Sequence, residues 1–294
     1  MSYSTIAIIY NPNSTGSSER LAKAFAKKVQ AKLPTQKIEL LGTTHARHAE
    51  ELAHAIATAS KNPLIISSSG DGGYNEIING ALKARKRGHS ITVGLLPAGN
   101  ANDHYHTVHE SDTIDLIVHN KTKKVDVLKI KSTADGKKIE RYAHSYIGFG
   151  LTPEVATELN KTKLNIFNEV WLVARGLFIV KPVRLKIGRK VRYYESVVFS
   201  NIDTMSKYLK ISQPSSITDG KFEVTIFRRR SKIKLILLLL QTSIQPAKED
   251  RKASKFVLDT VDKTLVQLDG EIVTLDGRAR TVITVEKRAL TCII

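Results

Sequence analysis

The stretch SSSGDGGYNEIINGAL, residues 67–82, decides how we expect the first half of the chain to fold. It begins within PLIISSS, residues 63–69, a run that is typical of a short buried strand. A Gly-Asp-Gly-Gly turn follows, and then apolar residues recur at helical spacing. Glycine lets a backbone turn sharply or approach a ligand closely, and a helix start offers N–H donors. The stretch therefore predicts a strand, a loop suited to phosphate and a helix, although many ordinary strand–helix turns look the same.

Asp71 stands in the middle of this loop, and no lysine accompanies it. The chain contains neither the GxxxxGK[ST] loop nor the full GxGxxG spacing of a dinucleotide site. A carboxylate beside a phosphate is repulsive unless a divalent cation stands between them. Asp71 thus favours a metal-bound phosphate over a bare one.

Strand and helix patterns alternate over the first 120 residues. Short connections join them, which is typical of a parallel sheet flanked by helices, a Rossmann-like α/β domain. In such sheets ligands lie at the carboxyl ends of the strands, where NPNSTGSS, GDGGYNE and PAGNAND fall here. The expected strands cover 5–11, 37–43, 63–69 and 91–97, and the expected helices cover 17–33, 49–60 and 75–87.

After about residue 125 the pattern changes to β-branched runs with partial alternation. Asp-Gly pairs occur at 135–136, 219–220, 269–270 and 276–277, and Asp-Gly between apolar runs predicts a hairpin. We expect a mostly antiparallel β-sandwich, interrupted by helices near 153–180 and 230–242. The predicted domains are 1–128 and 129–294, and the last residues either stay with the second domain or return to the first.

The composition, with 41% hydrophobic and 25% charged residues among 294, is that of a globular protein, but the net charge of +18 is unusual. Residues 1–125 hold 15 Lys and Arg against 10 Asp and Glu, so most of the excess lies in the second half. That surplus indicates an anionic partner. Cys292 is the only cysteine, and the longest apolar run, LILLLL at 235–240, is too short to cross a bilayer. We therefore expect a soluble, cytoplasmic protein.

Two further turns carry acidic residues. In PAGNANDHYH, residues 97–106, Asn102 and Asp103 fall at an expected helix start, where an N-cap explains them and a ligand site is the alternative. In VQLDGEIV, residues 266–273, a type I′ hairpin turn explains Asp269, and a general base with Glu271 as its helper is the alternative.

Together these motifs resemble the diacylglycerol kinase catalytic-domain family, the bacterial soluble lipid kinases related to sphingosine kinases. IIYNPNSTG resembles the opening NPxSG loop of the family, SGDGGYNEIING resembles GGDGTxNExxNG, and LLPAGNANDHYH resembles PxGTxNDFA. VDVLKI, SSITDGKFEVTIF and VQLDGEIV resemble three later segments, in the order of the family. The matches span residues 5 to about 273.

The resemblance implies two domains with an active site between them, and ATP- and Mg²⁺-dependent phosphorylation of a lipid hydroxyl. Diacylglycerol is the favoured substrate, and a sphingoid base or undecaprenol is the alternative. By the same resemblance, Asp269 with Glu271 serves as the base, Asp71, Asp103 and Asp126 serve the Mg²⁺–water network, and Asp219 binds a second Mg²⁺. The residues expected to hold ATP are Asn11, Pro12, Asn13, Ser14, Thr43, Ser69, Gly70, Asp71, Gly72, Gly73, Asn75, Glu76, Gly99, Asn100 and Asn102.

The chain departs from the family pattern at four places. Gly73 and Asn100 stand where the family has threonines expected to meet phosphates. Thr152 replaces an aspartate, and IDTMSKYLK, residues 202–210, replaces a glycine-rich run. These departures keep a non-catalytic lipid- or nucleotide-binding regulator as an alternative function.

Basic residues lie beside apolar ones in KPVRLKIGRKVR, residues 181–192, and in FRRRSKIKLILLLL, residues 227–240. A soluble lipid kinase must reach a membrane, so we expect a peripheral protein at the anionic inner membrane surface. A solvated basic face over a core helix is the plainer explanation of 227–240. No nucleic-acid-binding signature accompanies the charge, and a homodimer is compatible with the sequence. The trios His45, His48, His54 and His104, His106, His109 lack metal-site spacing, so we expect exposed or helix-flanking rings.

Overall fold

The computed structural model describes residues 3–14, 17–99, 102–109, 111–153, 181–205, 209–229 and 251–294, with a few residues between 231 and 247. The chain divides into two compact units, which we describe separately. Unit 1 comprises Met1–Val125 and Arg288–Ile294, and unit 2 comprises Asp126–Lys287. The helices expected near 153–180 and 230–242 fall largely outside the described residues. Among the described residues, no helix has the length and apolarity needed to span a membrane.

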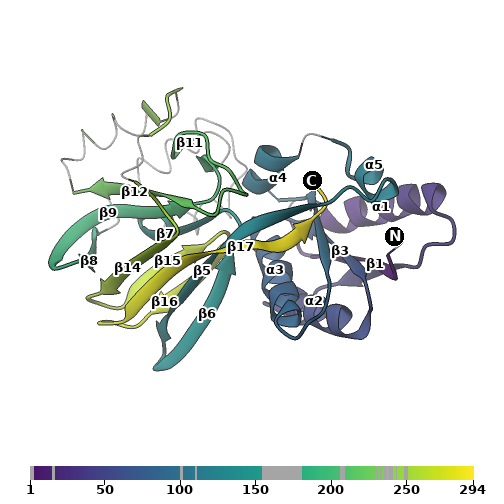
Figure 1. Cartoon of the computed structure of the whole chain (residues 1–294), viewed down its shortest axis with the longest axis horizontal. Helices are drawn as coiled ribbons and strands as arrows, with labels where there is room; N and C mark the ends of the chain where they lie inside the picture. Colours follow the sequence, from purple (N-terminus) through teal and green to yellow (C-terminus); the bar gives the residue numbers. More distant parts are fainter. Residues whose placement is uncertain are drawn as a thin grey trace. The chain divides into compact units, whose positions relative to one another are not determined.

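Unit 1 is built on a parallel sheet (Figure 1). Its strand order is β2-β1-β3-β4-β17, because the chain end returns so that Thr291 and Cys292 of β17 pair with Thr92 and Val93 of β4. The predicted parallel α/β fold is confirmed. The strands are β1 (Thr5–Tyr10), β2 (Ile38–Gly42), β3 (Pro63–Ser69), β4 (Thr92–Pro97) and β17 (Arg280–Cys292).

Helices cover the sheet, and packing of small and apolar residues explains their positions. Phe25 and Val29 of α1 pack with Ile6 and Ile8 of β1 in one buried cluster. The first turn of α2 lies very close to the middle of α3. A Cβ added at Gly80 would collide with the carbonyl oxygen of Glu50, so the glycine permits this approach. The helices are α1 (Ser18–Lys32), α2 (His48–Ala59), α3 (Asp71–Arg85), α4 (Asp103–Val108) and α5 (Thr113–Val118).

Helix α3 begins four residues before the position that the sequence predicts. We expected the glycine turn to precede a helix at 75–87, since glycine is a poor helix former. The helix instead starts at Asp71, and the N–H of Tyr74 already donates to the carbonyl of Gly70 at 3.1 Å. Most of the glycine stretch therefore forms the first helical turn, which brings its N–H groups to the end of β3.

Unit 2 is mostly antiparallel, as predicted. Strand β9 (Lys190–Ser200) organises it, because it pairs with β8 near its start and with β7 and β12 along its second half. The other strands are β5 (Lys123–Ala134), β6 (Lys137–Ala143), β7 (Tyr146–Gly150), β8 (Val183–Ile187), β10 (Thr204–Met205), β11 (Leu209–Lys210), β12 (Phe222–Arg228), β13 (Arg251–Ala253), β14 (Lys255–Thr260), β15 (Thr264–Leu268) and β16 (Glu271–Leu275).

The core of unit 2 centres on Phe199 of β9, which is fully buried. Its ring meets those of Phe149, Phe222 and Phe256 edge to face, with centroids 5.0 to 6.1 Å apart. Each such pair contributes about 0.5–1.5 kcal/mol beyond the area that it buries. The aromatic cluster joins four strands into one core.

Two of the four Asp-Gly pairs form the predicted hairpin turns. Asp135-Gly136 joins β5 to β6 with both residues at positive φ, and Asp269-Gly270 joins β15 to β16. The prediction is wrong for Asp219-Gly220, which precedes β12 in a loop, and for Asp276-Gly277, which links β16 to β17 although those strands pair with others. An Asp-Gly pair indicates a local turn, but it does not determine whether the two strands that flank the turn pair with each other.

We predict that His109 makes unit 1 sensitive to acid. Its ring stacks on Tyr105 at 4.2 Å, and burial lowers its pKa from 6.5 to about 4. Between these values the unfolded chain binds a proton that the folded chain does not, so the free energy of unfolding falls as the pH drops from 6.5 to 4. His109→Phe keeps an aromatic ring but cannot titrate. Urea unfolding at pH 7.5 and 4.5 should show a smaller loss for this variant, and equal losses would contradict the assignment.

Candidate functional site

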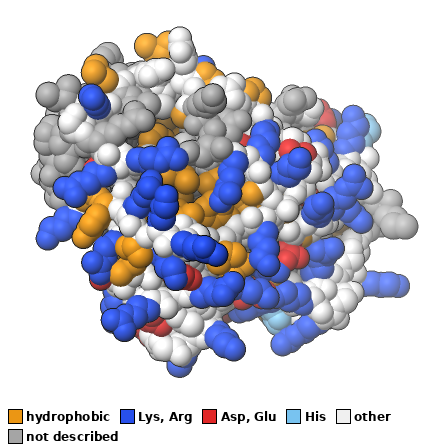
Figure 2. Space-filling model, turned by 60° about the vertical axis from the view of Figure 1, so that its left-hand side comes forward, with side chains coloured by type: hydrophobic (Ala, Val, Ile, Leu, Met, Phe, Trp, Pro, Cys, Tyr) orange, Lys and Arg blue, Asp and Glu red, His pale blue; other side chains and the backbone are white. Residues whose placement is uncertain are grey.

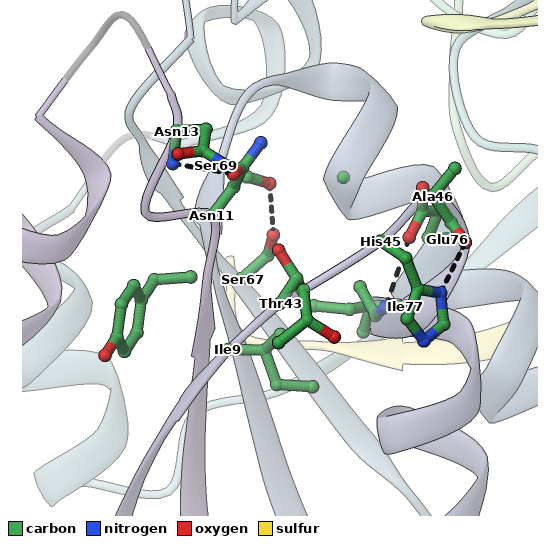
Figure 3. Close-up of a pocket in the computed structure, with 14 residues that line it drawn as sticks. Ile9, Asn11, Asn13, Thr43, His45, Ala46, Ser67, Ser69, Glu76 and Ile77 are labelled. Carbon is green, nitrogen blue, oxygen red and sulfur yellow. Dashed lines mark hydrogen bonds between the residues drawn. The ribbon is translucent and has the colours of Figure 1, made fainter.

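A cavity of about 310 Å³ opens at the carboxyl ends of β1, β2 and β3 in unit 1 (Figure 3). This is the edge of a parallel sheet at which ligands are expected. Its walls combine backbone-rich loops, four serine and threonine side chains and one carboxylate. The lining residues are Ile9, Tyr10, Asn11, Asn13, Thr43, Thr44, His45, Ala46, Ala49, Ser67, Ser69, Gly73, Glu76 and Ile77.

Six of the residues expected to hold ATP line this cavity: Asn11, Asn13, Thr43, Ser69, Gly73 and Glu76. They come from three separate segments of the sequence, and the sheet brings them together. Pro12, Ser14, Gly70, Asp71, Gly72 and Asn75 lie on the same loop and helix but not in the lining. Gly99 and Asn102 lie on the loop after β4, which is not part of the lining. Asn100 falls outside the described residues.

The glycine loops after β3 and β4 touch through their backbones. A Cβ added at Gly70 would lie 3.0 Å from the Cα of Gly99, and a Cβ at Gly99 would collide with the Cα of Gly70. A side chain at either position would force the loops apart. The hydroxyl of Ser14, 3.3 Å from the carbonyl oxygen of Ala98, ties the first loop to the same place.

Asp71 joins α3 to α4. Its carboxylate accepts hydrogen bonds from the backbone N–H groups of Asp103, at 3.2 Å, and His104, at 3.4 Å. We expected Asn102 to cap α4 itself, but its side chain turns back and bonds the backbone N–H and carbonyl of Gly99, both at 2.9 Å. The Asp71 carboxylate, which we predicted to bind a metal, therefore also accepts hydrogen bonds from the backbone N–H groups at the start of α4.

Glu76 and Asn75 have structural partners. The carboxylate of Glu76 accepts hydrogen bonds from the N–H groups of Arg47 at 3.1 Å and Ala49 at 3.2 Å, which caps α2 from a neighbouring helix. Asn75 is fully buried, and its amide oxygen accepts a bond from Asn79 at 3.0 Å. Glu76 forms part of the cavity wall, whereas Asn75 is buried and hydrogen-bonded within α3.

The carboxylates expected to bind Mg²⁺ are divided between the two units. Asp71 and Asp103 belong to unit 1, and Asp126 and Asp219 belong to unit 2. Asp126 is buried and accepts a hydrogen bond from the N–H of Gly220 at 2.6 Å, while Asp219 accepts one from the N–H of Lys221 at 2.9 Å. Asp219 therefore starts the turn whose next residue binds Asp126.

Asp269 is fully buried in unit 2, in the tight turn after β15. Its carboxylate accepts hydrogen bonds from the N–H groups of His144, Ser145 and Tyr146 at 2.8–2.9 Å, and lies 2.7 Å from Nδ1 of His144. Burial by itself would raise the pKa of this carboxyl, but the charge of His144 and the N–H donors outweigh it and lower the pKa. Glu271, the expected helper, instead forms an ion pair with Arg141.

Two residues at these sites, Ser67 and His144, were not predicted from the sequence. Ser67 lines the cavity beside Ser69, and the alternation of side chains along β3 was a signal that could have found it. His144 pairs with Asp269 across 125 residues, a contact that no local pattern contains. Long-range pairing of strands creates that contact.

The histidines of the two trios lie around α2 and α4. His45 and His48 stack at 4.5 Å, and their ring atoms approach Glu51, so the three could surround a cation. Nδ1 of His48, however, accepts a hydrogen bond from the N–H of Thr44 at 3.1 Å, so that atom is already engaged. His104 differs from the expectation of exposure, because it is buried against Tyr74.

Comparison with known proteins gives three concordant findings. A family model described as the diacylglycerol kinase catalytic domain matches residues 5–130. A diacylglycerol kinase of Bacillus subtilis is 22% identical over 90% of the chain and 88% of its own length, and sphingoid long-chain bases kinase 1 of Arabidopsis thaliana is 39% identical over 34% of the chain and 14% of its own length. The crystal structure of a diacylglycerol kinase from Bacillus anthracis has the same fold, with a TM-score of 0.72, 19% identity and coverage of 100% and 97% of the two chains.

We predict that Gly99→Ala destabilises unit 1, because its methyl group would push the two glycine loops apart. Overpacking of this kind costs about 1–3 kcal/mol. Gly136→Ala is the control: its Cβ meets open space, so it carries only the strain of positive φ, about 1–2 kcal/mol. Chemical denaturation should also show that ATP stabilises the wild type and the control but not Gly99→Ala. If ATP stabilised the Gly99 variant as much as the wild type, the loop contact would not shape the ligand site.

Proposed function

Because the chain belongs to the diacylglycerol kinase catalytic-domain family, whose domain spans residues 5–130, we propose that it transfers the γ-phosphate of ATP to a lipid hydroxyl. Diacylglycerol is the first substrate to test, since the Bacillus relatives are named diacylglycerol kinases. The observation that carries the proposal is the cavity at the strand ends, where six residues expected to hold ATP line one space.

In the proposed complex, the triphosphate lies against the first turn of α3. The N–H groups of a first helical turn have no acceptor within the helix, and the positive end of the dipole favours anions. The nucleoside would extend toward Thr43, Thr44 and Ala46, which also line the cavity. This arrangement needs no lysine, because backbone donors supply the positive charge density.

The donor chemistry at the loops suits Mg²⁺, which in nucleotide sites is held by one or two carboxylates, substrate phosphates and water. Asp71 fits this role beside the phosphate loop. Its two oxygens also accept hydrogen bonds from the backbone N–H groups at the start of α4, which fixes the orientation of the carboxylate. When bound, Mg²⁺ would neutralise charge on the phosphates. By the resemblance, Asp103 and Asp126 would serve its water network, and Asp219 would hold a second Mg²⁺ in unit 2.

In the proposed reaction, the lipid oxygen attacks the γ-phosphorus, its proton passes to the carboxylate of Asp269, and the bond to ADP breaks. The lowered pKa keeps this carboxyl ionised but makes it a weak base. A weak base suffices where phosphoryl transfer proceeds through a loose transition state that needs mainly positioning. His144 would hold Asp269 in place and balance its charge in the buried site.

A basic hairpin of unit 2 supports docking on an anionic membrane. The tip between β8 and β9 carries Lys186, Arg189, Lys190 and Arg192 beside Val191, which is 53% exposed. Tyr193 is 48% exposed, with the Arg229 guanidinium 5.7 Å from its ring centre. Figure 2 shows Lys and Arg side chains around hydrophobic ones on one face. Each basic group near an anionic leaflet contributes about 1 kcal/mol.

A non-catalytic lipid- or nucleotide-binding regulator is the second candidate. The observation in its favour is Gly73, which offers no hydroxyl where the family has a threonine. Such a protein would bind vesicles and nucleotide but transfer no phosphate.

The test is transfer of labelled γ-phosphate from ATP to lipids in mixed micelles, with diacylglycerol, a sphingoid base and undecaprenol in parallel. We expect a labelled product with diacylglycerol, and a loss of about 100-fold or more in Asp269→Asn, which removes the base. Asp259→Asn, a half-exposed carboxylate on β14, is the matched control and should keep full activity.

Vesicle sedimentation distinguishes the two candidates. If the protein sediments with phosphatidylglycerol vesicles but labels no lipid, the regulator is correct and the kinase proposal is wrong. Labelling that persists in Asp269→Asn would keep the kinase but overturn the assignment of its base.

A further inference from the structure

A second cavity of unit 1, of about 350 Å³, lies at the opposite edge of the sheet from the first. The end of α3 and the loop that leads into the amino end of β4 form one side of it, and β17 forms another. The two cavities share no lining residue. The lining residues of the second cavity are Ala81, Leu82, Arg85, Gly88, His89, Ser90, Ile91, Lys124, Arg288, Ala289, Leu290 and Thr291.

Four basic side chains line the second cavity, and among the described lining residues none is acidic. Arg85 belongs to the last turn of α3, His89 to the loop before β4, Lys124 to the start of β5 and Arg288 to β17. Positive charges brought to one cavity repel each other unless an anion lies among them. The arrangement therefore favours an anionic ligand.

The dipole of α3 explains only part of this charge. A basic residue in the last turn, such as Arg85, suits the negative end of a helix. That end carries about half an elementary charge, however, and the N–H of Gly88 already donates to the carbonyl of Arg85 at 2.9 Å. Lys124 and Arg288 come from strands, so the helix end does not account for them.

Ion pairing within the protein does not account for the charge either. Elsewhere in unit 1, Arg47 and Lys83 lie 2.7 and 2.8 Å from the carboxylate of the buried Glu50. By contrast, over the part of the chain that the structure describes, Arg85 and Lys124 form no ion pair. Their charges are therefore available to a ligand.

The backbone at Arg288 is irregular where it borders the cavity. Its φ of 48° is in the left-handed region, which is uncommon for a residue other than glycine inside a strand. Lys287 and Arg288 are both exposed and the next two residues are both buried, so the alternation of β17 is interrupted here. Irregularities of this kind redirect side chains and concentrate at functional sites.

We propose that this second cavity binds a phosphate-bearing anion, with Arg85, Lys124 and Arg288 as its charged contacts. Arginine forms paired hydrogen bonds with phosphate oxygens, and lysine supplies a compact positive charge. The ring of His89 and the hydroxyl of Ser90 line the same cavity and add polar groups. The volume is at the small end for ligand sites, which suits a small phosphorylated compound or the headgroup of one anionic lipid.

A bound anion would hold together two parts of unit 1 that are far apart in sequence. Lys124 belongs to the first segment of the unit, and Arg288 begins the segment that returns to it. An anion that contacts both binds only the folded unit, so it stabilises that unit. The inference goes beyond the proposed function and does not depend on it, because it involves no residue of the nucleotide cavity.

The experiment titrates the full chain with inorganic pyrophosphate in metal-free buffer, by calorimetry and by melting temperature. Arg85→Gln with Lys124→Gln removes two exposed positive charges from the cavity and should weaken binding at least about 10-fold, since charged groups make the stronger hydrogen bonds. The control, Lys27→Gln with Lys28→Gln, removes the same charge from exposed positions of α1 and should bind like wild type. Pyrophosphate that also enters the nucleotide cavity gives a second binding event, which the cavity variant keeps.

Sedimentation with phosphatidic acid vesicles, against phosphatidylcholine vesicles, distinguishes the sources of the phosphate. If the cavity variant loses pyrophosphate and vesicle binding together, a lipid headgroup reaches the cavity. If it loses pyrophosphate alone, the ligand is a soluble compound. Both results support the inference.

Equal pyrophosphate affinity in wild type, cavity variant and control would overturn the inference, as would a wild type that binds none. An equal loss in the control and the cavity variant would also overturn it, because net charge alone would then explain the binding. If the double variant does not fold, Lys124→Gln alone decides in the same way. Each of these failures leaves the proposed function intact, since lipid phosphorylation is measured separately.

Discussion

The close approach of Gly70 and Gly99 is the constraint on which the site in unit 1 depends. Two loops at the ends of adjacent parallel strands meet without side chains between them, and this lets Asp71 on one loop cap the helix that begins after the other. The capped α4 and the glycine-rich first turn of α3 are thereby held as one rigid edge. A site for phosphate requires donors fixed in this way, because phosphoryl transfer depends on positioning more than on covalent chemistry.

Much of this edge could be predicted from the sequence, because its signals are local. The alternating strand and helix patterns predicted six of seven elements to within one residue of their observed bounds, with α3 the exception, and the turns after the strands marked the cavity. What failed was the role of individual polar groups. Asn102 was expected to cap its own helix, but the cap comes from Asp71, 32 residues away in sequence. Side-chain partners chosen by tertiary packing leave no trace in local spacing.

In unit 2, too, the local turns and strands could be predicted from the sequence, whereas the partners of individual side chains could not. Alternation and turn residues predicted a mostly antiparallel domain, and the turn at Asp269 is a hairpin as its Asp-Gly pair indicates. Its burial against His144 follows from the pairing of β15 with β7, which brings residues far apart in sequence together. The hairpin explanation and the proposed catalytic role are therefore not exclusive. Asp269 has a positive φ in this turn, and His144 and the backbone N–H donors together lower the pKa of its buried carboxyl.

The most direct test of the account is a crystal structure of the protein with a non-hydrolysable ATP analogue and Mg²⁺. The account predicts that the triphosphate lies against the first turn of α3, in the cavity that Ser69 and Gly73 line, and that Asp71 is one of the residues that hold Mg²⁺. The nucleoside should point toward Thr43 and Ala46. A triphosphate bound away from this turn would contradict the central claim.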